Sequence, residues 1–277
     1  MDKEFWAEIA KNDYKIPEGY TLEELTETLF GFLYSTDSEL RDDIAYVTYA
    51  NWLKREMYSK SEIRVHVNEL LGNLDQGIGE PESDSVFLRT FSILLLAEII
   101  YNDNKKSLLE RDQVQSLLVR GLRYLEAEKD SRGHIPVKGW AHALAHTADL
   151  MLELAKNRFT GKEDLEKILR SIAKKLVHST NWIYIHGEDD RLANAVTAIL
   201  QRDLLTMDEI GAWIESMTKP DTPWVGAWMD EARTRAFGNI RNFVRSVFLK
   251  ILSSENLPRK AEIQALMMEA TTALVPY

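Results

Sequence analysis

The chain has 277 residues, of which 45% are hydrophobic, and this is enough apolar material for one continuous core or two adjoining ones. A formal net charge of −10 and a pI near 5.2 argue against nucleic acid and anionic membranes as partners, because binding to either depends largely on clustered lysine and arginine. There is no cysteine, so disulfides, thiolate metal sites and a cysteine nucleophile are excluded, and any divalent metal would need histidine and carboxylate ligands.

The N-terminal segment and the most apolar run bear on location. The segment Met1 to Glu8 contains acids where a secretory signal needs a basic stretch and then an apolar one, which predicts a cytoplasmic protein. The apolar run over 91–101 is interrupted by Glu98. It falls well short of the roughly 20 residues that span a bilayer. We therefore expect a buried core helix there and no membrane association.

Capping boxes predict where several helices begin. In this motif a serine or threonine side chain accepts from the third helical amide, and a glutamate three residues later accepts from the cap's own amide. The matching pairs are Thr21 with Glu24, Ser59 with Glu62, Thr160 with Glu163, and Thr206 with Glu209. Apolar residues follow at spacings of three and four, which predicts amphipathic helices. No set of alternating segments bounded by tight turns predicts a sheet, so we expect almost no strand.

Breaks rich in glycine, proline, asparagine and aspartate divide the chain at 77–81, 130–136, 187–190 and 219–226. After each break comes a more apolar predicted helix, and these cover 86–101, 140–155, 192–201 and 240–252, with an earlier one over 40–53. The spacing of roughly fifty residues is typical of stacked helix pairs. The sequence therefore predicts an all-α, HEAT-like α-solenoid of about five helix pairs, with 1–277 as a single helical-repeat domain. An α/α toroid and an irregular helical bundle remain open alternatives.

Polar residues recur on one stripe of these apolar helices, at spacings of three and four that share a helical face. If the helices stack in register, the stripes line one concave groove. Its candidate residues are Arg89, His142, His146, Asp149, Arg191, Asn239 and Asn242. Buried polar groups of this kind must meet each other, water or a ligand. For Arg89 and Arg191, internal ion pairs are an alternative to binding an anionic substrate.

The densest local signal is the pair His142 and His146, whose spacing of four lets two imidazoles reach one metal ion on a helix. Asp149 lies about 10.5 Å along the helix from His142, which suits a role in orienting His146. A third ligand would come from the acidic cluster Glu188, Asp189 and Asp190. A packing network or a metal-free ligand pocket would also explain the histidines, and the acids would equally suit the start of a helix.

Five pieces of the chain carry a family resemblance. They are Leu40-Arg-Asp-Asp-Ile-Ala-Tyr46, Val86-Phe-Leu-Arg-Thr-Phe-Ser92, Gly139-Trp-Ala-His-Ala-Leu-Ala-His-Thr-Ala-Asp149, Glu188-Asp-Asp-Arg-Leu-Ala193 and Asn242-Phe-Val-Arg-Ser246. In this order the sequence resembles a bacterial family known as domain-of-unknown-function family 2785. The resemblance implies a helical fold in a bacterial cytoplasmic protein. It implies no activity and no site residues.

Two functional hypotheses follow. The first is a non-enzymatic helical-repeat protein that binds a protein or a small ligand in the concave polar groove. The second is a metal-dependent, hydrolase-like enzyme with a divalent ion on His142 and His146 and substrate held by Arg89 or Arg191. The sequence has no phosphate-binding loop, dinucleotide fingerprint or nucleophile elbow, which gives no support to the chemistries that need those motifs.

Overall fold

The computed structural model describes residues 1–178, 180–219, 224 and 226–274, and these form an all-α fold with one short hairpin. The helices are α1 (Lys3–Lys11), α2 (Leu22–Phe32), the π-helix η1 (Glu39–Tyr46), α3 (Val47–Lys54), α4 (Lys60–Asn73), α5 (Val86–Lys106), α6 (Arg111–Ala127), α7 (Ala143–Lys156), α8 (Lys162–Val177), α9 (Glu188–Gln201), α10 (Met207–Thr218), the 3-10 turn η2 (Ala227–Met229), α11 (Glu231–Ser253) and α12 (Lys260–Ala273). The strands are β1 (His134–Ile135) and β2 (Gly139–Trp140). The all-α prediction is confirmed.

Three of the four predicted capping boxes begin helices as expected. Thr21, Ser59 and Thr206 each accept from the third helical amide, and the paired glutamate accepts from the cap's own amide. The fourth prediction, Thr160 with Glu163, is wrong by one residue. Gly161 caps α8, and its amide donates to Asp164 over 3.3 Å. Thr160 is buried before the helix instead.

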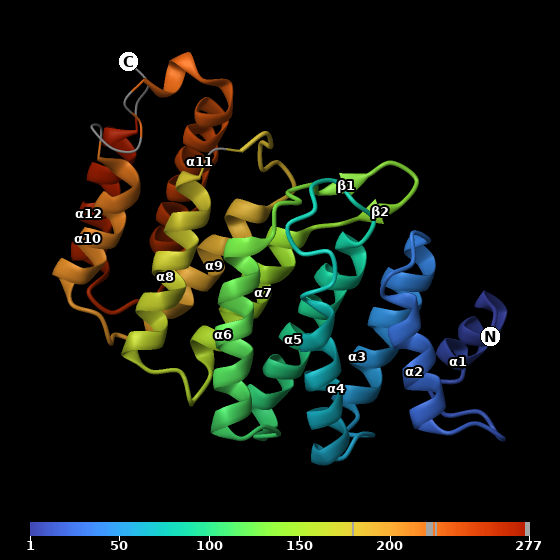
Figure 1. Cartoon of the computed structure of the whole chain (residues 1–277). Helices are drawn as coiled ribbons and strands as arrows, with labels where there is room; N and C mark the ends of the chain where they lie inside the picture. Colours follow the sequence, from blue (N-terminus) through green and yellow to red (C-terminus); the bar gives the residue numbers. More distant parts are fainter. Residues whose placement is uncertain (179, 220–223, 225, 275–277) are drawn as a thin grey trace.

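The helices form two layers (Figure 1). Helices α5, α7, α9 and α11 pack on one another in chain order, and η1 and α3 pack on α5. We call these six helices the inner layer. Helices α4, α6, α8, α10 and α12 follow one another in the same way and form the outer layer. Contacts within the inner layer are the more extensive. Buried alanines of α7 and α9, such as Ala148 and Ala195, allow this close approach.

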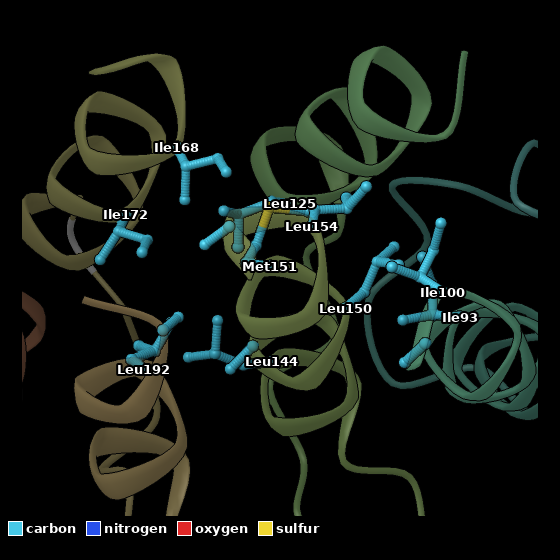
Figure 2. Close-up of a cluster of buried hydrophobic side chains, with 14 of the residues drawn as sticks. Ile93, Ile100, Leu125, Leu144, Leu150, Met151, Leu154, Ile168, Ile172 and Leu192 are labelled. Carbon is cyan, nitrogen blue, oxygen red and sulfur yellow. The ribbon is translucent and has the colours of Figure 1, made fainter. Parts of the chain in front are cut away.

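A continuous hydrophobic core joins the two layers. Figure 2 shows Ile93 and Ile100 of α5 beside Leu150 of α7, with side chains from α6, α8 and α9 on the other side of α7. The predicted core helix over 91–101 is confirmed, because Ile93, Ile99 and Ile100 are fully buried within α5. Each inner helix is covered on more than one side, which explains why its sequence is apolar beyond a single stripe.

The predicted breaks at 77–81 and 130–136 lie between an outer helix and the next inner helix. The break predicted over 187–190 is mostly helix, because Gly187 takes φ 84° and α9 starts at the next residue. The acids Glu188, Asp189 and Asp190 form the first turn, which fits the helix-start interpretation. The break over 219–226 falls mainly outside the described residues.

The predicted helix over 40–53 consists of η1 followed by α3. The hairpin β1–β2 pairs His134 with Trp140 and packs against the start of η1. Gly139 has φ +80°, and an added Cβ would lie 2.7 Å from the Cβ of Ser38, so only glycine fits this approach. Arg41 of η1 donates to the carbonyl of Lys138 over 2.9 Å, which holds the hairpin in place.

Helices α1 and α12, the first and last described helices, lie at opposite sides of the molecule (Figure 1). Among the described residues, α1 and α2 have no extensive contact with any helix after α5. None of the helices in the described part of the chain has the length and apolar character to cross a membrane.

Candidate functional site

An ion pair between α7 and α9 lies at the centre of the candidate site. Arg191 Nη1 donates to Asp149 Oδ2 over 2.6 Å, and the two side chains are 36% and 31% exposed. Burial raises the pKa of Asp149 to about 6, although the positive charge of Arg191 acts in the opposite direction. Sequence analysis selected these residues from separate motifs, and the packing of α7 on α9 brings them together.

A pocket of about 220 Å³ adjoins this pair, and only inner-layer residues line it. Leu94, Ala97 and Leu152 supply its apolar walls. Its polar lining consists of Tyr46, Glu98, Tyr101, Asp149 and Glu153. We call these five residues together with Arg191 the inner-face site. Sequence reasoning missed Tyr46, Tyr101 and Glu153, and noted Glu98 only as an interruption of the apolar run. Helical spacing could have indicated two of them, because Tyr101 lies three residues after Glu98 and Glu153 lies four residues after Asp149.

The carboxylates of the inner-face site are incompletely compensated. Burial raises the pKa of Glu98, and a hydrogen bond from Asn102 Nδ2 at 2.9 Å offsets only part of the rise. Burial and the charges of Glu98 and Asp149 also raise the pKa of Tyr46. Glu153 is better paired, since it accepts from Lys156 at 2.8 Å and Asn104 at 3.1 Å. Two of the three carboxylates would therefore gain free energy from a further positive charge.

The π-helix η1 supplies a second charged pair at the same layer. Arg41 is fully buried, lies 4.1 Å from the centre of the Phe87 ring, and contacts Asp42 at 2.8 Å. Burial raises the pKa of Asp42 to about 6, and the Arg41 charge opposes the rise. π-helical segments are rare and are found frequently at functional sites. Here the segment places Arg41 under the hairpin and Tyr46 in the inner-face site.

His142 and His146 are both buried and belong to an aromatic cluster rather than to an open groove. The His142 ring stacks on the Trp140 ring with their centres 4.2 Å apart, and the His146 ring lies edge-on to the His142 ring with centres 5.7 Å apart. His146 Nδ1 lies 2.9 Å from the hydroxyl of Thr90. Burial lowers the pKa of His142 to about 4 and holds the pKa of His146 well below its ordinary value, so both imidazoles are neutral at pH 7. His142 also adopts a left-handed φ of 52° at the start of α7.

Two histidines that sequence reasoning missed complete this cluster. His134 lies 4.9 Å from the Trp140 ring and His186 lies 5.4 Å from it. The hairpin and the loop before α9 bring them there, and local spacing carries no signal of it. Among the described residues, His142 Nε2 and His186 Nδ1 are buried without a hydrogen-bond partner.

The candidate metal ligands do not converge. Glu188 accepts from the amide of His186 at 2.8 Å, Asp189 accepts from Ser246 at 2.8 Å, and Asp190 is exposed. Within the described ranges, no three histidine, aspartate or glutamate side chains are grouped so that they could hold a metal ion. The geometry gives no support to a divalent metal on His142, His146 and an acid of the 188–190 cluster.

The remaining groove candidates are separate from the inner-face site. Arg89 is fully buried and binds both carboxylate oxygens of Glu128, at 2.6 and 3.2 Å. This is the internal ion pair that the sequence predicted as the alternative to binding an anionic substrate. Asn239 is also buried, donates to the carbonyl of Trp182 and accepts from the amide of Tyr184, each over 2.9 Å. Asn242 is half-buried on α11. Of the predicted groove set, the structure joins Asp149, which lines the pocket, to Arg191, which forms an ion pair with it.

Comparison with known proteins gives one match. The family model described as "Protein of unknown function (DUF2785)" matches residues 74–249, which include α5 to α10 and most of α11. Five of the six residues of the inner-face site lie inside this range, and the sixth, Tyr46, lies before it. No curated protein and no solved structure matches the chain.

Proposed function

The chain belongs to the DUF2785 family, and because the description of that family assigns no activity, we propose a function from the inner-face site itself. We propose that the protein is a non-enzymatic helical-repeat protein that binds a ligand through a cationic group, an ammonium or a guanidinium. In this proposal the chain is a single domain and an open, HEAT-like solenoid, with the inner layer on its concave side. The closer packing of the inner helices and the separated ends support that arrangement.

The observation that carries the proposal is the juxtaposition of three carboxylates in one pocket. Glu98, Asp149 and Glu153 line the same 220 Å³ space. Arg191 contacts one of the three, and burial still raises the pKa of Asp149 and of Glu98. A cation entering the pocket would stabilise these charges, which are partly removed from water. Nucleic acid is not an expected ligand, since phosphates would meet carboxylates here and the net charge is −10.

The aromatic walls also suit a cation. The ammonium of Lys105 already lies 3.5 Å from the centre of the Tyr101 ring. Lys105 itself is exposed, so a ligand cation can replace it over the ring at little cost. Among the described residues the guanidinium of Arg191 donates to Asp149 alone, and it carries further N–H groups for a carbonyl or carboxylate of the same ligand. The site therefore fits a basic group attached to a polar backbone.

Calorimetric titration with two probes tests the proposal. Spermidine represents a small amine, and an acetylated and amidated peptide with one arginine represents a basic side chain of a protein. We expect saturable binding of at least one probe, weakened roughly tenfold, or about 1.4 kcal/mol, in Glu98→Gln and in Asp149→Asn. Glu163→Gln, an exposed acid in the first turn of α8, is the matched control and should leave the affinity unchanged.

The two probes distinguish the sources of the cationic group. Binding of spermidine alone would indicate a small-molecule ligand, and binding of the peptide alone would indicate a protein partner. If neither probe binds, or if Glu163→Gln weakens binding as much as the pocket variants, the inner-face site is not a cation site.

A further inference from the structure

A second pocket, of about 430 Å³, lies at the other layer of the molecule, between the C-terminal ends of α6 and α8 and the loops that follow them. Its lining includes Lys129, Arg132, Lys175, Trp182 and Tyr184. It shares no lining residue with the inner-face site. Its volume lies in the range of small-molecule sites.

Lys175 is the central cation of this pocket. Its Nζ donates to the carbonyl oxygen of Glu128 over 2.5 Å. The carboxylate of Glu128 is already held by Arg89 at 2.6 and 3.2 Å, so it does not form an ion pair with Lys175. Burial lowers the pKa of the Lys175 amine, and the charge of Glu128 offsets only part of this effect. An ammonium has three donors, and the described residues provide an acceptor for one of them.

Trp182 supplies a second unused donor. Its indole Nε1 is buried and has no hydrogen-bond partner among the described residues. The backbone around it is held by Asn239, which donates to the Trp182 carbonyl and accepts from the Tyr184 amide, each at 2.9 Å. A donor that is fixed in place and buried without an acceptor is destabilising, and an acceptor on a ligand would recover that loss.

The other charges of the pocket leave a positive balance. Arg132 pairs with Asp130 at 2.5 Å and Lys174 pairs with Glu126 at 2.5 Å, so these four charges are satisfied internally. One lining carboxylate, Glu82, then remains for two lining amines, Lys129 and Lys175. The unpaired donors and the unpaired positive charge favour the same kind of ligand.

We propose that this pocket binds a small organic anion, a carboxylate or a phosphate monoester, whose charged group accepts from Lys175 Nζ and from Trp182 Nε1. The ring of Trp182 and the side chain of Tyr184 provide surface for an apolar body on that anion. The pocket is a binding site in addition to the inner-face site, and it takes the opposite charge.

Titration by NMR of the full chain with phenyl phosphate, benzoate and inorganic phosphate tests this proposal. The chain has seven tryptophans, so the indole N–H signal of Trp182 can be assigned by its loss in Trp182→Phe. We expect phenyl phosphate or benzoate to shift this signal in a saturable way at millimolar concentrations, because the N–H gains an acceptor. Comparison of these two probes shows which head group is preferred. Inorganic phosphate shows whether the apolar body contributes.

Two variants and a control make the test specific. Lys175→Met should raise the Kd at least tenfold. Trp182→Phe should raise it severalfold, and because this variant lacks the indole signal its Kd is measured from the backbone amide signals of the pocket lining. Lys167→Met carries the same change two turns earlier on α8, at an exposed ion pair, and should leave the Kd unchanged. A melting curve for each variant separates lost binding from lost folding, and Trp182→Phe, which preserves an aromatic ring, covers the case in which Lys175→Met does not fold. The proposal is overturned if no probe shifts the Trp182 signal, or if Lys167→Met weakens binding as much as Lys175→Met.

Discussion

Single residues in this protein divide into those paired inside the fold and those left with unmet charge. Arg89 and Glu128 are of the first kind, because each is almost fully buried and satisfied by the other. Asp149 and Glu98 are of the second kind, because burial raises their pKa values although polar neighbours are in contact. Residue type alone did not distinguish paired from incompletely compensated charges, because an arginine on an apolar helix is compatible with an internal ion pair and with a ligand site. The contacts of each side chain separate them.

Removing one member of the buried Arg89–Glu128 pair should be strongly destabilising. Arg89→Met leaves the carboxylate of Glu128 buried without its arginine, and we expect a loss of about 3–5 kcal/mol in the free energy of unfolding. Urea denaturation measures this loss. The control Arg170→Met breaks an exposed pair with Glu166 on α8 and should cost less than about 1 kcal/mol. Equal costs for the two variants would contradict the assignment of Arg89 as a buried structural cation.

Asp149 should give the protein a pH dependence of definite sign. Its folded-state pKa of about 6 lies above the ordinary value of 3.8, so the folded protein binds the proton more tightly than the unfolded chain. The free energy of unfolding therefore decreases, through this group, as the pH rises through that window. Asp149→Asn cannot titrate, so the stability of the wild type relative to this variant should fall between those two pH values. Urea denaturation at several pH values, with Glu163→Gln as the control, measures the difference, and a rise instead of a fall would show that Arg191 dominates.

At the scale of the element, the inner helices are distinguished by how closely they approach. Helix α7 lies between α5 and α9 and packs extensively on both, and its buried alanines leave room for neither a branched nor a longer side chain. The apolar periodicity of 140–155 predicted a helix there. It did not predict that the first residues would form β2 and that α7 would begin at Ala143, because the hairpin depends on contacts with η1 that are distant in sequence.

Overpacking the alanine face of α7 should therefore be costly. Ala148 is fully buried, and Ala148→Leu should lower the free energy of unfolding by about 1–3 kcal/mol because α7 must move away from a neighbouring helix. Val119→Leu, at an exposed position on α6 that is 62% accessible, is the matched control and should have little effect. Thermal and urea denaturation would measure both. A neutral Ala148→Leu would indicate that the inner layer is packed more loosely than described.

At the scale of the whole molecule, the chain ends are supported differently from the centre. Helices α5, α7 and α9 have inner-layer neighbours on both sides, whereas α1 and α12 lie at the two ends. A helix that is packed on fewer sides opens more easily than one covered on several sides, so we expect α1 and α12 to open before the inner helices.

Hydrogen exchange should report this gradient directly. We expect the amides of α5, α7 and α9 to exchange slowest and those of α1 and α12 to exchange fastest, because neither end helix packs between two helices of the inner layer. Exchange followed by mass spectrometry on the full chain measures the order. Uniform protection along the chain would instead indicate a globally cooperative unit.

The sequence by itself determined the all-α class, three helix starts and the buried helix over 91–101. These follow from local chemistry, in which hydrogen-bonding caps and a period of 3.6 residues act within one turn or a few. Only the tertiary structure decided that Asp149 meets Arg191, that Glu98 and Tyr46 share their pocket, and that His134 and His186 join His142 around Trp140. Apart from His134 and Trp140, which the hairpin brings together, those contacts join residues that lie tens of residues apart. Burial, and not residue type alone, then sets the pKa of each buried acid and leaves some buried donors without a partner.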